Sequence, residues 1–112
     1  MAQNRNKLID IFISNISNFV THRILEKAIK NSEIASWYRK ELINSFKIAK
    51  KYRDMINPKN KLPERDILYI KDKVFRRVRS ELLVRINKGY EGIDLNAINE
   101  EIGSVLSETE VI

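Results

Sequence analysis

The chain has 112 residues, enough for a single domain, and its composition excludes several kinds of site. Hydrophobic residues make up 43% and charged residues 32%, against usual values of about 45–50% and about 25%, which indicates a globular protein with an unusually ionic surface. The absence of cysteine excludes disulfides, thiolate catalysis and any zinc or iron–sulfur site with cysteine ligands. Three glycines and two prolines leave little material for turns, so we expect one all-α domain over residues 1–112.

The formal net charge of +6 is distributed unevenly along the chain. Six of the 15 acidic residues and no Lys or Arg lie from position 91 onward, which gives this tail a charge of −6 and residues 1–90 a charge of +12. A basic body with an acidic tail indicates a polyanionic partner, and the tail is then either a balancing charge or a competitor for the same surface. The alternative is that the charge only solvates the surface.

No apolar run approaches the roughly 20 residues that span a bilayer, and the N-terminus lacks the three regions of a signal peptide. We therefore expect a soluble, cytoplasmic protein. The basic faces also lack a dedicated Trp or Phe insertion face, so we expect no membrane partner.

The first predicted helix covers residues 8–29, and its apolar pattern changes direction part-way. Up to Val20 the apolar residues share one helical face, but those from Ile24 onward lie on a face turned by roughly 100°. We interpret the change as a kink or break near residues 21–23. Alternation of Ile9, Ile11 and Ile13 offers a competing strand, weakened because Phe12 fills the face that should be polar. Residues 1–7 are polar and are expected to fray.

A second helix is predicted from Ser32, which can cap it, to the helix-ending pair Asn57-Pro58. Its apolar residues form two stripes that together cover about half of its circumference. The main stripe is Ala35, Tyr38, Leu42, Phe46, Ala49, Tyr52 and Ile56, and the flanking stripe is Trp37, Ile48 and Met55. We expect this helix to contact two elements, either the first and third helices or a second subunit. For its aromatic residues, core packing outranks base stacking.

Residues 63–89 carry the clearest helix signal and the densest positive charge. Pro63 suits the first turn of a helix, and Gly89 suits the left-handed residue that commonly ends one. Between them, apolar residues recur three or four positions apart on one side: Ile67, Ile70, Val74, Val78, Leu82 and Ile86. The connector over residues 57–62 is short, so we expect the second and third helices to form an antiparallel hairpin.

A short acidic helix should follow, with Asp94 as its N-cap and a hydrophobic staple between Ile93 and Ile98. Its apolar face comprises Leu95, Ile98, Ile102, Val105 and Leu106, and residues 107–112 are expected to be loose. The predicted fold is thus a small helical bundle of three long helices, the first kinked, plus a short acidic C-terminal helix.

Two basic ridges supply the candidate nucleic-acid-binding residues. The second helix contributes Lys40, Lys47, Lys50 and Lys51, and the third contributes Lys73, Arg76, Arg77 and Arg79. Cations in such rows can follow a phosphate backbone, and the planar guanidinium of arginine suits phosphate. The alternatives are a solvated surface on the second helix and local ion pairs on the third, between Asp72 and Arg76 and between Arg77 and Glu81. A third basic patch surrounds the connector: Lys50, Lys51, Arg53, Lys59, Lys61 and Arg65.

Nothing in the sequence indicates catalysis. His22 is the only histidine, so a catalytic triad lacks support, any metal site would need carboxylates alone, and we expect His22 to make a local polar contact. There is no glycine-rich phosphate loop. We predict a small basic, non-enzymatic accessory protein that has no cofactor or metal and binds DNA or RNA mainly through phosphates. The alternative is an assembly subunit that uses an exposed apolar helix face to bind an acidic protein partner or a second copy of itself.

Overall fold

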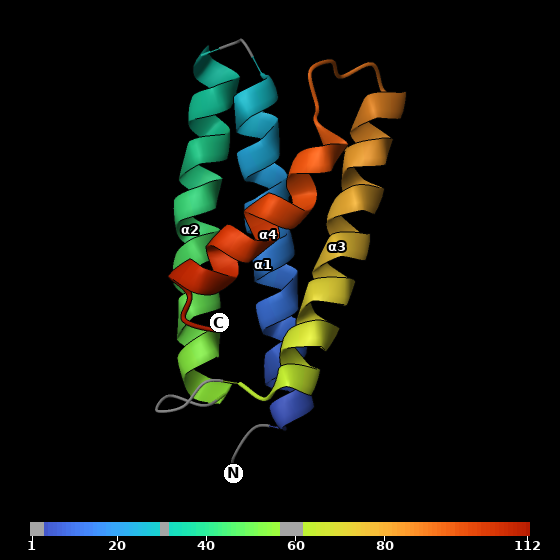
Figure 1. Ribbon diagram of the computed structural model, residues 1–112. Coiled ribbons are helices and arrows are strands. Elements are labelled where there is room, and N and C mark those ends of the chain that lie inside the picture. Colours follow the sequence, from blue (N-terminus) through green and yellow to red (C-terminus); the bar gives the residue numbers. More distant parts are fainter. Residues whose placement is uncertain (1–3, 30–31, 57–61) are drawn as a thin grey trace.

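The computed structural model describes residues 4–29, 32–56 and 62–112, and all regular structure in these ranges is helical (Figure 1). In chain order the elements are α1 (Arg5–Ala28), α2 (Ser32–Ile56), α3 (Glu64–Asn87), the 3-10 turn η1 (Leu95–Ala97) and α4 (Ile98–Glu108). The predicted all-α bundle of three long helices and a short C-terminal helix is confirmed. Lys59 and Lys61 of the third basic patch lie outside the described residues.

The central helix of the bundle is α1. It packs against α2, which runs antiparallel to it, against α3, which runs parallel to it, and against α4, which crosses in front (Figure 1). The helix is continuous through residues 21–23, so the break that the sequence suggested is absent. Both of its apolar faces are buried because it has neighbours on several sides. This accounts for the change of apolar face between Val20 and Ile24. A bend in its axis stays a prediction.

The prediction that α2 and α3 pack against each other as a hairpin was wrong. The two helices run in opposite directions, but they make almost no direct contact because each packs on α1 instead (Figure 1). The main stripe of α2 is buried where it faces α1, as Leu42 and Ala49 show, whereas Trp37 and Met55 of the flanking stripe are exposed. With a relative exposure of 53%, Trp37 is not the core residue that we expected.

The ends of α3 agree with the predicted signals. Pro63 is its N-cap, and Gly89 follows the C-cap with φ +97°. The N–H of Gly89 donates to the carbonyl of Ile86 at 3.0 Å, and that of Tyr90 donates to the carbonyl of Arg85 at 3.1 Å. These two bonds are the Schellman arrangement that glycine favours at a helix end.

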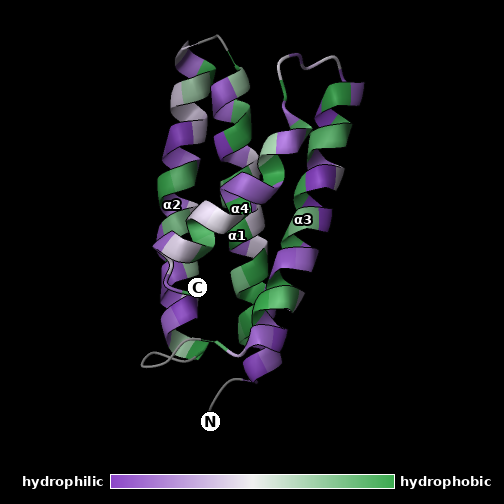
Figure 2. Cartoon of the chain, viewed as in Figure 1, coloured by the Kyte–Doolittle hydropathy of each residue, from purple (hydrophilic) through white to green (hydrophobic). Residues whose placement is uncertain are grey.

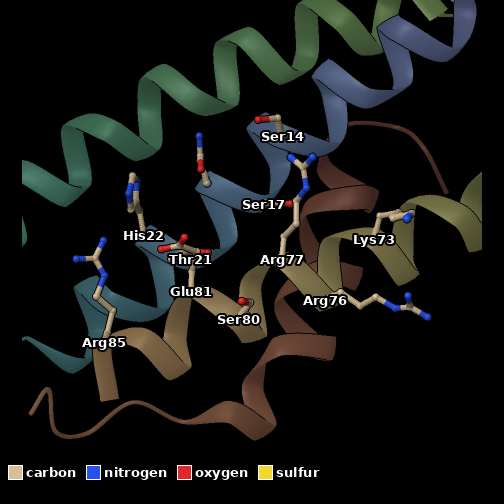
Figure 3. Close-up of a pocket in the computed structure, with 11 residues that line it drawn as sticks. Ser14, Ser17, Thr21, His22, Lys73, Arg76, Arg77, Ser80, Glu81 and Arg85 are labelled. Carbon is tan, nitrogen blue, oxygen red and sulfur yellow. The ribbon is translucent and has the colours of Figure 1, made fainter. Parts of the chain in front are cut away.

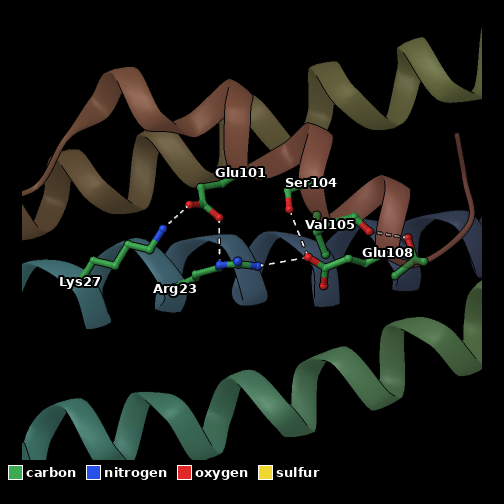
Figure 4. Close-up of polar contacts among 7 residues, drawn as sticks. Arg23, Lys27, Glu101, Ser104, Val105 and Glu108 are labelled. Carbon is green, nitrogen blue, oxygen red and sulfur yellow. Dashed lines mark hydrogen bonds and ion pairs between the residues drawn. The ribbon is translucent and has the colours of Figure 1, made fainter.

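α4 closes the bundle with an apolar face and a set of ion pairs. Ile98, Ile102, Val105 and Leu106 are buried, as predicted. Glu101 is also buried, and its carboxylate pairs with Lys27 Nζ at 2.6 Å and Arg23 Nε at 3.0 Å (Figure 4). The same guanidinium reaches Glu108 at 3.4 Å. The acidic helix is thereby fastened to α1.

Fraying was expected over residues 1–7 and 107–112; residues 1–3 lie outside the described residues, and the described part of both segments is largely regular. The side chain of Asn4 accepts a hydrogen bond from the Asn6 N–H at 2.8 Å, and α1 begins at Arg5. At the other end α4 continues to Glu108, and Thr109 and Val111 are fully buried.

Arg53, which we predicted in the third basic patch, is instead buried against the C-terminal segment. Its Nε and Nη2 atoms donate to the Glu110 carbonyl oxygen at 3.1 and 2.9 Å. The arginine therefore ties α2 to the C-terminal segment.

Hydrophobic and hydrophilic residues alternate along each long helix (Figure 2), as expected for helices with one buried and one exposed side. None of the helices in the described ranges combines the length and the apolar character needed to cross a membrane.

We expect Leu106→Ala to lower the free energy of unfolding by about 2–5 kcal/mol, because it truncates a fully buried side chain that holds α4 on the bundle. Urea denaturation measures this change. The control is Ile112→Ala, which truncates an exposed side chain nearby and should change the value by less than about 0.5 kcal/mol. Equal effects of the two substitutions would contradict the packing of α4.

Candidate nucleic-acid interface

A polar groove of about 690 Å³ lies between α1 and α3 (Figure 3). The α1 side contributes hydroxyl, amide and imidazole groups from Ser14, Ser17, Asn18, Thr21 and His22. The α3 side contributes four cations, one hydroxyl and one carboxylate from Lys73, Arg76, Arg77, Ser80, Glu81 and Arg85. The groove therefore has a polar floor and a basic wall.

Helical periodicity explains why these side chains meet. On α3 the buried residues Ile70, Val74, Val78 and Leu82 recur every four positions and face the core. Lys73, Arg77, Glu81 and Arg85 recur at the same step beside that row, so they border the line where α3 meets α1. The polar residues of α1 likewise recur three or four positions apart.

The structure gathers some of the predicted cations and separates others. Lys73, Arg76 and Arg77 line the groove, whereas Arg79 does not. Arg85 joins them and was missed by the sequence analysis, although its spacing of eight from Arg77 puts both on one side of the helix.

Most of these cations have no carboxylate partner. Arg76 Nε lies 3.3 Å from Asp72, the local ion pair that we had considered. No ion pair with any described residue forms at Lys73, Arg77, Arg79 or Arg85, so the pair between Arg77 and Glu81 is not made. In Figure 3, Arg77 extends from α3 toward Ser14 and Ser17. Uncompensated positive charge beside neutral donors is an environment that attracts anions.

Arg85 and His22 form one end of the groove, where polar atoms are buried without partners. Arg85 Nε and His22 Nδ1 make no hydrogen bond to any described residue. Burial lowers the pKa of His22 below 6.5, and the charge of Arg85 lowers it further, while Glu41 and Glu81 act in the opposite direction. His22 is therefore neutral near pH 7, and the Arg85 donor remains available to an acceptor that enters the groove.

The cations of α2 lie apart from the groove. Lys40, Lys47 and Lys51 are exposed and Lys50 is half-buried, but none of the four lines the cavity. Lys50 Nζ lies 3.8 Å from the Glu110 carboxylate, and Lys51 Nζ lies 5.9 Å from the centre of the Tyr52 ring. The two predicted ridges are thus separate surfaces.

The acidic C-terminal segment does not neutralise the groove. Glu101 and Glu108 pair with Arg23 and Lys27 of α1 (Figure 4), and Glu110 pairs with Lys50 of α2. No carboxylate of this segment is among the described residues that line the cavity, so the segment leaves the charge of the groove unchanged.

Within the described ranges, no three His, Asp or Glu side chains gather closely enough to hold a metal ion. Comparison of the chain with protein-family models, with curated proteins and with solved structures gave no match.

We expect the only histidine to titrate below pH 6.5, which proton NMR can follow without ambiguity. A folded-state pKa below the unfolded value means that the unfolded chain binds more protons, so stability should fall as the pH drops through about 6.5. Unfolding free energies at about pH 7.5 and about pH 5.5 should therefore differ more for the wild type than for His22→Gln. A midpoint above 6.5, or equal differences for the two proteins, would contradict the buried, neutral imidazole.

Proposed function

We propose that this protein is a non-enzymatic, cytoplasmic accessory protein that binds DNA or RNA through phosphate contacts in the groove between α1 and α3. The observation that carries the proposal is the gathering of Lys73, Arg76, Arg77 and Arg85 beside the polar floor of α1. Three of these cations have no ion-pair partner among the described residues.

The chemistry of the groove suits phosphodiester oxygens. Arginine presents a planar fork of donors that matches phosphate, and each neutralised phosphate releases counterions. Ser14 and Asn18 can add neutral donors from the floor, whereas the Ser17 hydroxyl already donates to the Ile13 carbonyl at 2.7 Å. Phosphate contacts of this kind position a nucleic acid without reading its base sequence.

The length of the basic wall is also suitable. From Lys73 to Arg85 the helix rises about 18 Å at roughly 1.5 Å per residue. Each strand of a duplex advances about 3.4 Å along the helix axis per phosphate, so the length of the wall matches the rise of about five nucleotides.

Exposed apolar residues on α2 favour a second candidate, an assembly subunit that binds another protein or a second copy of itself. Trp37, Ile43 and Met55 have relative exposures of 53%, 55% and 45%. Self-association in light scattering would support this candidate, and a monomer at all concentrations would count against the homodimer.

We expect labelled oligonucleotides to bind with an affinity that falls steeply between about 50 and about 200 mM salt, as measured by fluorescence anisotropy. Arg77→Ala should weaken binding about tenfold and reduce the salt slope by about 1, because it removes one phosphate contact. Glu81→Gln should strengthen binding, because Glu81 is the only carboxylate among the described residues that line the groove.

Arg79→Ala is the matched control. Arg79 is on the same helix, is also exposed and also has no ion pair among the described residues, but it is not among the residues that line the groove. Its removal should change the affinity less than about threefold through long-range attraction alone. Equal losses for the two variants would show that binding depends on overall charge, and no binding at about 50 mM salt would refute the proposal.

A further inference from the structure

We infer that the groove accepts a single strand of nucleic acid whose phosphates lie along α3 while one base stacks on Trp37. This inference rests on the proposed function and specifies its ligand as single-stranded.

Trp37 is exposed in spite of its aromatic neighbours. Its ring centre lies 4.9 Å from that of Tyr38 and 6.0 Å from that of His22, with interplanar angles of 75° and 61°. Both contacts are T-shaped, so neither neighbour lies flat against the indole. With 53% of its surface exposed, the indole can take a base as a flat stacking partner.

His22 connects Trp37 to the groove. The imidazole lines the cavity, contacts Trp37 and lies 5.3 Å from the ring centre of Tyr38. Arg85 extends toward His22 in Figure 3, and its charge lowers the pKa of the imidazole. The exposed indole therefore lies beside the end of the groove where the row of cations finishes.

The aromatic residues at this end are held in place by one another. Tyr38 is buried, and this burial raises its pKa, with a further contribution from the nearby Tyr90. Arg85 lies 5.8 Å from the centre of the Tyr90 ring. Contacts from α1, α2, α3 and the segment after α3 thus meet around His22 and Tyr38. A stacking surface that is already ordered loses little conformational entropy when a base binds.

Only a single strand can use both parts of this surface. In a duplex the bases are paired and stacked inside the helix, so the phosphates can reach the cations but no base can lie on Trp37. An unpaired base can rotate away from its neighbours and stack on an aromatic side chain while its own phosphates stay in a basic groove.

Intrinsic fluorescence tests the inference, because Trp37 is the only tryptophan. We expect an oligothymidylate of about eight nucleotides to quench the emission of the full chain, a site size in the usual range for single-strand binding. A duplex and inorganic polyphosphate, which offers phosphates without bases, should bind without stacking and cause little quenching.

Trp37→Ala should weaken oligothymidylate binding by about 5- to 150-fold, the range for one stacked base, with an unchanged salt slope. Its affinity for polyphosphate should stay within about twofold, and Trp37→Phe should restore most of the lost affinity. Tyr69→Ala is the matched control, because Tyr69 is an exposed aromatic residue beside Lys73 that does not line the groove.

The outcomes separate this inference from the proposed function. If Trp37→Ala weakens polyphosphate as much as oligothymidylate, Trp37 has only a structural role and the inference is overturned. If single strand and duplex bind equally, without quenching but with dependence on Arg77, the inference fails and the proposed function stands. If no polyanion binds at low salt, both fail.

Discussion

The arrangement of the molecule depends on covering α1, which carries apolar side chains on most of its circumference. Phe12, Ile16, Val20 and Leu25 are all fully buried, and no single neighbouring helix can cover a helix on so many sides. Three helices therefore gather around α1, and α2 and α3 both pack on it while making almost no contact with each other. Polar side chains of α1 beside α3 form the floor of the groove.

The ion pairs that hold α4 on α1 determine which of the described cations are left without an acidic partner. Glu101 is buried with Arg23 and Lys27 around it, and a carboxylate in that position is stable only with its cations close by. The acidic tail thus satisfies cations of α1 at this contact. Among the described residues, only Arg76 of the α3 cations at the groove has an ion-pair partner, so a chain with a modest net charge presents a basic surface there.

Local signals in the sequence predicted local structure well, and pairing between helices poorly. Pro63 and Gly89 act within a turn of the helix ends, so both boundaries of α3 were correct. The change of apolar face along α1 is consistent either with a break in the helix or with a second helix packed against it. Only the tertiary contacts distinguish these two possibilities. The short connector favours opposite directions for α2 and α3, but it does not require the two helices to contact each other. Each of them packs on the larger apolar surface of α1 instead.

The candidate site was partly predictable for the same reason. The row from Lys73 to Arg85 follows from helical spacing, and the whole row, including Arg85, could have been found in the sequence. Separating Arg77 from Arg79 requires knowing which side of α3 meets α1. The exposure of Trp37 was not predictable, because an apolar stripe does not reveal whether a neighbour covers it.

The central claim is that anions bind at the α1–α3 groove and not at the lysines of α2. A titration of the isotope-labelled protein with a short oligonucleotide, followed by backbone amide NMR, tests this most directly. We expect shift changes concentrated in residues 14–22 and 73–85, with residues 40–51 nearly unchanged. Changes centred on residues 40–51, or spread evenly over every basic helix, would contradict it.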